Sequence, residues 1–332
     1  MALFEQIKAY LRVNPFYRKY CEVPVNNFRF MLRNMKYYRQ LYGWKKDKEI
    51  EGHTIYFIID PNIEHPGLVD RLNSIVCTYY IAKVNGFDFK IIFTNPFVLS
   101  DYLSVASQNW LASFDDLSYS IQNTRLLSYN GSGKVPKLNK NVKQYHVYCY
   151  KGYDILYENQ IRDCYKVWSD LFNELFRPTP ILEQALHAYA DIQDKGFIAV
   201  HLRFVNALEQ FENTYFNLLE QEQKENLIRR CVDAVRNIMN QYSGETVIVF
   251  SDSELFLNRI QKELPVIILD GKIGHISFNG SDEVVLKTFV DFYMIAKSKK
   301  TIRILGAEMY MSTFSRYAAI SGGKINEDYY LN

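Results

Sequence analysis

Short apolar runs recur along the chain and predict buried strands. Each run is rich in Val, Ile, Leu or Phe and is bounded by polar residues or glycine. Continuous apolarity of this kind is typical of parallel strands that are covered on both faces. The predicted strands are Thr54–Asp60, Phe89–Phe93, Gly196–Leu202, Thr246–Phe250, Val266–Leu269 and Thr301–Leu305.

Segments with apolar residues three or four positions apart lie between these strands and predict helices. The alternation of buried strand and amphipathic helix predicts the α/β class, with doubly wound parallel sheets. The predicted helices are Leu68–Asn85, Asn226–Tyr242, Val284–Ser298 and Ser315–Ser321.

Two series of strands and helices predict two Rossmann-like domains. The first series starts near residue 54 and the second near residue 196, with a mainly helical stretch over residues 150–195 between them. The prolines of Arg177–Pro180 predict a helix stop inside that stretch. We expect an N-terminal domain over residues 1–180 and a C-terminal domain over residues 181–332. A substrate cleft is expected between them.

The composition indicates an ordinary globular protein of a reducing compartment. The five cysteines are an odd number and form no CxxC pair, so neither a disulfide framework nor a zinc site is indicated. Charges appear early at the N-terminus, and no uncharged run reaches the length of a membrane span. We therefore expect a cytoplasmic protein.

Positive charge is concentrated at the N-terminus. Residues 1–48 contain 11 Lys/Arg and 3 Asp/Glu, a net charge of +8 in a chain whose total is +2. Basic residues interleaved with aromatic ones suit peripheral contact with the inner face of an anionic membrane, or with a phosphorylated lipid carrier. The alternative is a solvated helical face whose aromatic residues pack on the core. Nucleic acid is not an expected partner, because the bias is confined to one end. The aromatic residues are Tyr17, Tyr20, Phe28, Phe30, Tyr37, Tyr38, Tyr42 and Trp44.

Polar residues follow two predicted strands of the second series. His201 and Arg203 end one strand, and Asp252 and Ser253 end the next. Ligands of open α/β sheets bind at the carboxyl ends of the strands. The guanidinium of Arg203 could bind a diphosphate through two donors, and Asp252 could accept hydrogen bonds from a ribose or from guanine. The structural alternatives are an ion pair for Arg203, a core position for His201 and a helix cap for Asp252 and Ser253.

Two predicted helix starts carry further candidate residues. Hydroxyl groups and backbone N–H groups at the start of a helix bind phosphate, and a glycine before a helix lets a ligand approach the backbone. In both places an ordinary cap or solvated first-turn charges are the alternative. No ligand cluster accompanies Asp252, so no metal site is predicted. The candidates are Gly67, Asp70, Arg71 and Asn73 in the first series and Ser312, Thr313, Phe314 and Ser315 in the second.

The order of these motifs resembles the GDP-fucose-dependent fucosyltransferases, which include α1,2- and α1,6-enzymes and the protein O-fucosyltransferases. The resemblance covers roughly residues 54–325, and its specificity comes from six short segments in the same order. These segments are Gly67–Leu72, Leu175–Pro180, Val200–Arg203, Val249–Ser253, Asp291–Ser298 and Ser312–Gly323.

The resemblance implies a GT-B architecture and inverting transfer of fucose from GDP-fucose to a glycan hydroxyl, without a metal ion. It places a nucleotide sugar in the C-terminal half, where Arg203 would bind the diphosphate, His201 would support the donor and Asp252 would contact the nucleoside. Residues Ser312–Ser315 would line the pyrophosphate and the base, and the loop at Gly67 would face them. The acceptor implied is a glycan of a surface polysaccharide, with lipid-linked glycans among the options.

Three departures from the family pattern keep alternatives open. Val69 stands where a second glycine is common, Asn206 stands where the family has a carboxylate, and Gly306–Met311 is longer than usual. A catalytic base would then come from elsewhere, and Glu209 and Glu212 are the nearest acidic residues. The alternatives are a transferase that uses another nucleotide sugar, or an inert relative that binds nucleotides or glycans.

Overall fold

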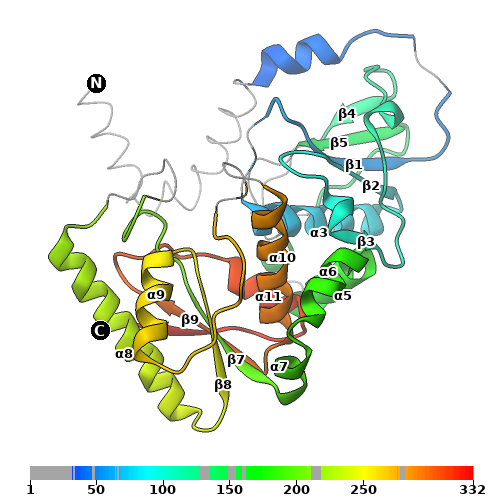
Figure 1. The fold of residues 1–332 in the computed structure, drawn as a ribbon. Coiled ribbons are helices and arrows are strands. Elements are labelled where there is room, and N and C mark those ends of the chain that lie inside the picture. The colour runs from blue at the N-terminus through cyan, green and yellow to red at the C-terminus, as the bar shows by residue number, and fades with distance from the viewer. Residues whose placement is uncertain are drawn as a thin grey trace.

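The computed structural model describes most of the chain and shows two separate four-stranded sheets (Figure 1). None of the helices in these parts is long and apolar enough to cross a membrane. The described residues are 32, 34–46, 49–63, 65, 67–127, 135–148, 155–158, 162–210, 218–274, 276 and 281–331.

The first sheet has the strand order β2-β1-β5-β4, and all neighbouring strands are parallel. Its strands are β1 (Thr54–Ile59), β2 (Asp88–Phe93), β4 (Thr124–Leu126) and β5 (Gln144–Tyr148). Alternate residues of β1 enter different apolar clusters. Ile55, Phe57 and Ile59 pack with helix α3 (Leu68–Asn85), and Tyr56 and Ile58 pack with Leu117 on the opposite face. Because successive side chains of a strand point to opposite faces, both faces of β1 are buried.

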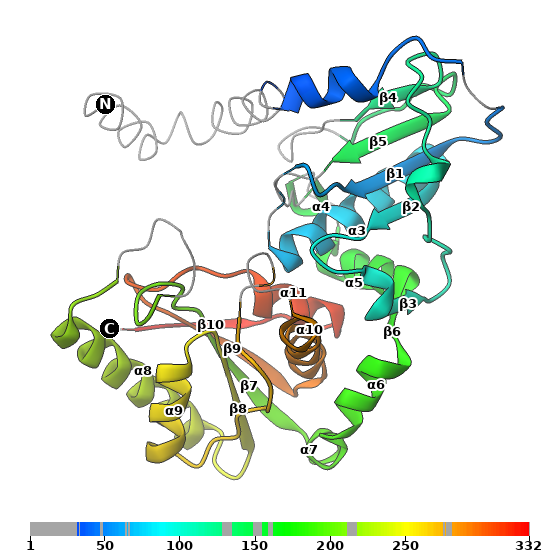
Figure 2. The same ribbon diagram turned by 45° about the horizontal axis from the view of Figure 1, so that its top comes forward.

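The second sheet has the strand order β10-β9-β7-β8 and is also parallel throughout. Helices cover both of its faces: α8 and α9 pack on one, α10 and α11 on the other (Figure 2). The strands are β7 (Phe197–Leu202), β8 (Thr246–Ser251), β9 (Lys300–Leu305) and β10 (Glu327–Tyr330). The helices are α8 (Gln221–Gln241), α9 (Glu254–Glu263), α10 (Asp282–Lys297) and α11 (Phe314–Ser321).

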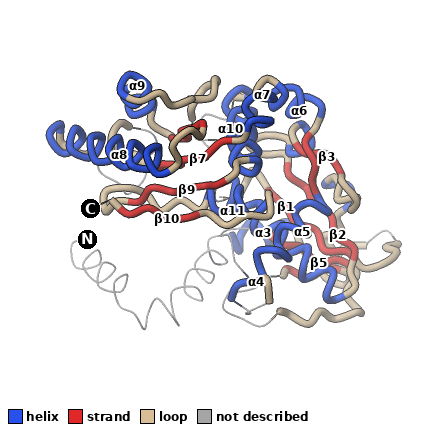
Figure 3. Tube along the Cα trace, turned by 90° about the horizontal axis from the view of Figure 1, so that it is seen from below, coloured by secondary structure: helices blue, strands red, loops and turns tan. Residues whose placement is uncertain are grey.

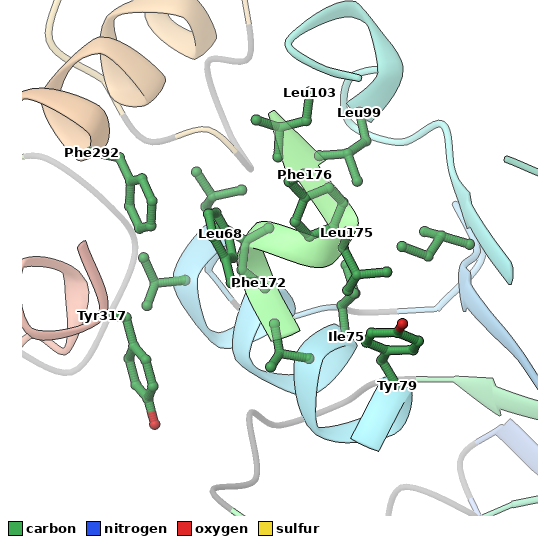
Figure 4. Packing of buried hydrophobic residues seen from close by; sticks show 14 of the residues in the cluster. Leu68, Ile75, Tyr79, Leu99, Leu103, Phe172, Leu175, Phe176, Phe292 and Tyr317 are labelled. Carbon is green, nitrogen blue, oxygen red and sulfur yellow. The ribbon is translucent and has the colours of Figure 1, made fainter. Parts of the chain in front are cut away.

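A helical layer joins the two sheets (Figures 2 and 3). Helix α5 contacts both α3 and α11, and α11 contacts α10. Residues of α3, α5, α10 and α11 belong to one apolar cluster, which includes Phe172 of α5 and Tyr317 of α11 (Figure 4). The remaining elements are η2 (Leu99–Asp101), β3 (Leu103–Val105), η3 (Phe114–Asp116), α4 (Ile155–Glu158), α5 (Cys164–Leu175), β6 (Phe176–Pro178), α6 (Pro180–His187) and α7 (Ala190–Lys195).

Close packing of α11 against α10 requires a glycine after α11. A Cβ atom at Gly322 would lie 2.0 Å from the backbone oxygen of Ala296, so no larger residue fits without moving the chain. The ammonium group of Lys324 then donates to the oxygens of Ala296 and Ser298, which are carbonyls at the end of α10. Cations near the last carbonyls of a helix are favourable. This contact fixes the orientation of α11 relative to the second sheet.

Most of the predicted elements are observed, with two corrections. Helix α3 has its predicted bounds, and α8 begins five residues earlier than predicted. The prediction of a strand over Val266–Leu269 is wrong, because this segment makes only an isolated bridge between Ile267 and Ile248 of the edge strand β8. Strand β5 was not predicted, because its sequence QYHVY places Gln144 and His146 in the core.

The described part of the basic N-terminal stretch packs on the first sheet. Residues 34–41 are helical, and the Tyr38 ring packs against the tilted ring of Tyr148 with centroids 5.3 Å apart. Tyr42 lies against His146, whereas Trp44 is 80% exposed. For these tyrosines the structure agrees with the packing alternative. Tyr17, Tyr20, Phe28 and Phe30 lie outside the described residues, and membrane contact through residues 1–48 stays a prediction.

Candidate functional site

Arg203 and Asp252 form an ion pair at the carboxyl ends of β7 and β8. The Nε atom of Arg203 lies 3.2 Å from Oδ2 of Asp252. The same carboxylate accepts hydrogen bonds from the backbone N–H of Phe204 (2.8 Å) and of Val205 (2.7 Å), and Val205 has a left-handed φ of 54°. Both oxygens of Asp252 are therefore engaged by the chain itself. This carboxylate holds the turn that carries Arg203, whose side chain is 23% exposed.

Burial and neighbouring charges act against each other at Asp252. Desolvation raises the pKa of its carboxyl group above the ordinary value, and Arg203 and the two amide donors offset part of this increase. A charge-assisted hydrogen bond to Arg203 also restricts the rotation of that side chain. The predicted contact of Asp252 with a nucleoside stays a prediction, and the structural ion pair considered for Arg203 is present.

His201 and Ser315 each bury a polar atom that has no hydrogen-bond partner among the described residues. These atoms are Nδ1 of His201 and Oγ of Ser315. The His201 ring stacks on Phe314 with centroids 5.8 Å apart, and Ser315 follows Phe314 at the start of α11. Desolvation lowers the pKa of His201 to about 3, and the charges of Arg203 and Arg303 act in the same direction. The imidazole is therefore neutral and offers one nitrogen as an acceptor.

Arg303 is a residue of this site that the sequence analysis missed. It stands on β9 directly beside His201, which is its register partner on β7. Its Nε and Nη2 atoms bind the two carboxylate oxygens of Asp328 at 2.9 and 2.8 Å, and its Nη1 donates to the backbone oxygen of Ser312 at 2.5 Å. A buried arginine that makes two parallel hydrogen bonds to a carboxylate is held in one orientation. Arg303 thus fixes the loop before α11 to the second sheet.

The predicted residues Ser312 to Ser315 lie together at the N-terminus of α11. The Ser312 hydroxyl accepts a hydrogen bond from the backbone N–H of Phe314 at 3.2 Å, and Thr313 is the N-cap residue. The backbone N–H of Tyr310 donates to the oxygen of Arg203, so the Gly306–Met311 segment is tied to the end of β7. Arg203, His201 and the start of α11 therefore form one cluster.

The predicted residues of the Gly67 loop have separate environments. Asn73 is buried and accepts from the indole N–H of Trp168 at 2.9 Å, which is a packing role. The Arg71 guanidinium lies over the Phe93 ring, 5.4 Å from its centroid. Gly67 is the N-cap residue of α3. Asp70 approaches the α11 cluster, since its Oδ1 accepts from Oγ1 of Thr313 at 3.5 Å.

Glu209 lies at the start of α9, beside Ser253. Its Oε1 accepts from the Ser253 hydroxyl at 2.7 Å and from the backbone N–H of Leu255 at 3.3 Å. The Ser253 hydroxyl also accepts from the N–H of Phe256, so both residues cap α9. Glu209 is thus committed to a helix terminus, and Glu212 lies outside the described residues. Ser253 therefore caps α9, which was the structural alternative for this residue.

The cluster has the chemistry of an anion-binding site. A fixed guanidinium, two unpartnered polar atoms and the start of a helix favour a ligand with negative charge and hydrogen-bonding oxygens. Within the described segments, no three His, Cys, Asp or Glu side chains are grouped in a way that could hold a metal ion.

Solved structures share the fold of this chain, although no protein-family model and no curated protein sequence matches it. NodZ α1,6-fucosyltransferase soaked with GDP-fucose is 12% identical with a TM-score of 0.55, and the match covers 81% of this chain and 92% of that chain. NodZ from Bradyrhizobium matches at 12% identity and a TM-score of 0.55, covering 81% of this chain and 93% of that chain. A variant of Arabidopsis thaliana FUT1 in complex with GDP is 12% identical with a TM-score of 0.53. This match covers 92% of this chain and 77% of that chain.

These likenesses confirm the predicted fold class and support the resemblance at the level of the fold. Identities of this size show the fold alone. The chain is an α/β protein with parallel sheets and has the fold of GT-B fucosyltransferases. The division into residues 1–180 and 181–332 stays a prediction.

Proposed function

We propose that this protein is a glycosyltransferase that transfers fucose from GDP-fucose to a hydroxyl of a glycan acceptor. In this proposal the diphosphate of the donor binds between Arg203 and the N-terminus of α11. Inversion at the sugar carbon, the absence of a metal requirement and a setting in surface-polysaccharide assembly are part of the same proposal. Solved neighbours with the same fold were captured with GDP-fucose or GDP, which supports the choice of donor.

The observation that carries the proposal is the pair of unpartnered atoms beside Phe314. A buried polar atom without a hydrogen bond costs about 1–3 kcal/mol, so folded proteins rarely retain two in one place without a ligand. His201 Nδ1 and Ser315 Oγ are two such atoms, and Arg203 adds a cation that is not fully buried. A nucleoside diphosphate would supply the missing partners and the opposite charge.

The same groups suit the departure of a diphosphate. Negative charge develops on the bridging oxygen as the bond to the sugar breaks, and fixed donors that face this oxygen lower the barrier. Arg203 is held by Asp252, and the loop before α11 is held by Arg303, so little reorganisation is needed during the reaction. The neutral His201 adds no charge and is suited to accept a hydrogen bond from the donor.

Thermal unfolding in EDTA tests the proposal most directly. A ligand that binds only the folded protein at 100 times its Kd adds about 2.7 kcal/mol to the free energy of unfolding. We expect GDP to raise Tm in EDTA, and ADP and UDP to raise it less. Release of GDP from GDP-fucose, assayed beside other nucleotide sugars, then identifies the donor.

Each result of these measurements has a clear meaning. Stabilisation by GDP only after Mn²⁺ or Mg²⁺ is added would contradict metal-independent binding. Turnover of a different nucleotide sugar would replace fucose with that sugar. GDP binding without turnover of any donor would identify an inert nucleotide-binding relative, and no stabilisation by any nucleotide would overturn the proposal.

A further inference from the structure

We propose that Asp328, on the last strand of the chain, is a positioning residue for the diphosphate of the donor. This inference rests on the proposed function, because it concerns the same site. Asp328 touches no substrate in this proposal. It acts through Arg303, which holds the peptide unit between Ser312 and Thr313. Asp328 lies beyond residues 54–325, where the chain resembles the fucosyltransferases, so no family motif assigns it a role.

Strand β10 stands at the edge of the second sheet and carries Asp328 beside Arg303 (Figure 2). The two residues are register partners, and both carboxylate oxygens of Asp328 accept from Arg303, at 2.9 and 2.8 Å. The amide group of Asn326 donates to the same carboxylate at 2.9 Å. The side chain of Arg303 is only 8% exposed, and a buried cation is costly unless an anion pairs with it. Asp328 supplies that anion.

The third hydrogen bond of Arg303 fixes a backbone group at the start of α11. Nε and Nη2 are taken by Asp328, and Nη1 donates to the backbone oxygen of Ser312 at 2.5 Å. A guanidinium is planar and rigid, so the two bonds to Asp328 determine the direction of the third. Loss of the carboxylate should therefore also release the Ser312 oxygen.

The peptide unit between Ser312 and Thr313 transmits this orientation to the candidate donor site. A trans peptide unit is planar, and its C=O and N–H bonds point in opposite directions. Because the Ser312 oxygen faces Arg303, the N–H of Thr313, the N-cap residue of α11, faces away from Arg303. Backbone N–H groups at a helix start bind phosphate oxygens. Asp328 thus sets the direction of one donor where the diphosphate is proposed to bind.

Two buried atoms point independently to a ligand at this helix start. Oγ of Ser315, in the first turn of α11, is fully buried and has no hydrogen-bond partner among the described residues. The same holds for Nδ1 of His201, which is the register partner of Arg303 on β7. The contacts that start at Asp328 therefore end beside the atoms for which a ligand would supply partners.

Glu327 provides a matched comparison on the same strand. It precedes Asp328 on β10 and pairs with Lys300 of β9 at 2.7 Å, so both residues form ion pairs across the same two strands. The Lys300 ammonium lies 5.0 Å from the ring centroid of Tyr242, the residue that follows α8. This second pair is at the start of β9, whereas the donor site is proposed at the carboxyl ends of the strands.

Calorimetric titration with GDP tests the positioning role. Asp328→Asn keeps the size of the side chain, removes its charge and turns one acceptor oxygen into a donor. We expect it to raise the Kd of GDP about 10- to 100-fold, because misplacement of a binding group by about 1 Å can cost about 100-fold. Asp328→Glu keeps both oxygens and the charge and should restore most of the affinity. Glu327→Gln should leave the Kd unchanged.

A double-mutant cycle tests whether Asp328 acts through Arg303. Arg303→Lys keeps the cation beside Asp328 but lacks the planar fork that also reaches Ser312, so it should raise the Kd of GDP as well. Residues that act as one unit have non-additive effects. The variant with both Asp328→Asn and Arg303→Lys should therefore bind GDP about as weakly as the weaker single variant, whereas full additivity would contradict the proposed route.

Urea unfolding of each variant separates positioning from stability alone. A merely structural role would lower the free energy of unfolding and leave the Kd of the folded protein unchanged. If Asp328→Asn does not fold, Arg303→Lys and Asp328→Glu carry the comparison, because both retain the two charges. A wild-type Kd in folded Asp328→Asn or in Arg303→Lys overturns this inference and leaves the proposed function standing. A wild-type protein that binds no nucleotide overturns the proposed function, and this inference with it.

Discussion

Each of the two sheets buries a histidine on an interior strand, His146 on β5 and His201 on β7. Desolvation lowers the pKa of both to about 3, so both imidazoles are neutral. Their hydrogen bonding differs. Tyr42 donates to Nδ1 of His146 at 2.6 Å, and Nε2 of the same ring lies 3.0 Å from Oε1 of Gln144. Nδ1 of His201 has no hydrogen-bond partner in the described part of the chain.

The same contrast extends to the residues around each histidine. The Tyr42 hydroxyl also bonds to the Tyr148 hydroxyl at 2.8 Å, and Tyr37 donates to Asp60, which follows β1, at 2.6 Å. Residues 34–42 therefore complete the carboxyl end of the first sheet from within the chain. Beside the second sheet, the Ser315 hydroxyl likewise has no hydrogen-bond partner among the residues that the structure describes.

This difference separates a structural network from a candidate ligand site. Buried polar groups that are satisfied within the chain stabilise the fold, whereas unsatisfied ones lower stability until a ligand pairs with them. A substitution in the first network should therefore change stability, and one in the second should change ligand binding. Each variant below tests this contrast.

The largest effect is expected from Arg203→Lys. Lysine keeps the charge beside Asp252 but loses the planar fork of donors, which should remove about 2–4 kcal/mol of transition-state stabilisation, or roughly 30- to 1,000-fold in turnover of GDP-fucose. The free energy of unfolding should change little. A wild-type kcat together with a lower free energy of unfolding would show that Arg203 has a structural role, like the residues around His146.

Ser315→Ala should weaken GDP binding without destabilising the free protein. Loss of a hydrogen bond to a charged oxygen is worth about 1.5–3 kcal/mol, which corresponds to roughly a 10- to 150-fold higher Kd. Because the hydroxyl has no partner in the free protein, its removal should leave the free energy of unfolding unchanged or higher. Calorimetric titration with GDP and urea unfolding measure the two quantities.

Ser321→Ala is the matched control on the same helix. The Ser321 hydroxyl donates to the backbone oxygen of Ala318 at 2.7 Å, at the opposite end of α11 from Ser315. This variant should leave the Kd for GDP unchanged. Equal Kd values for Ser315→Ala and wild type would show that the unpartnered hydroxyl does not face the nucleotide.

Tyr42→Phe should have the opposite profile. It leaves Nδ1 of the buried His146 without a donor, which should lower the free energy of unfolding by about 1–3 kcal/mol. The shift in Tm produced by saturating GDP should remain that of the wild type. Tyr330→Phe, at an exposed position of β10, controls for the loss of a hydroxyl. Weaker GDP binding by Tyr42→Phe would contradict the separation of the two regions.

The smallest expected effect is a pH dependence that both histidines share. Their pKa values in the folded protein, about 3, lie below the unfolded value near 6.5. The unfolded chain therefore binds protons first as the pH falls, and stability is lost below about pH 6.5. At pH 5.5 each histidine should account for about 1.4 kcal/mol of lost stability.

Urea unfolding at pH 7.5 and pH 5.5 measures this loss. His146→Gln and His201→Gln should each reduce the difference between the two pH values by a similar amount, although only His201→Gln should weaken GDP binding. A variant with the pH dependence of the wild type would show that its histidine is not neutral and buried as the structure has it.

Local pattern accounts for the elements that were predicted well. Helix α3 has apolar residues at helical spacing, β7 and β9 are short apolar runs, and Arg203 and Asp252 follow strands whose carboxyl ends meet at one edge. Strand β5 was missed because polar residues inside a strand weaken the apolar pattern. Arg303 was missed as a site residue because it lies within the predicted strand Thr301–Leu305 and not at its end. The burial of these polar residues depends on partners such as Tyr42, Asp328 and Ser312 that lie elsewhere in the chain.

The sequence by itself determined the class of fold, the approximate bounds of most elements and the strand ends that carry charged residues. These properties follow from local periodicity and from the common direction of parallel strands. The tertiary structure alone decided which polar groups are already paired. Tyr42 and His146 are 104 residues apart, and Asp70 and Thr313 are 243 residues apart. A residue's type states what it can bond to, but only packing decides whether the chain or a ligand supplies the partner.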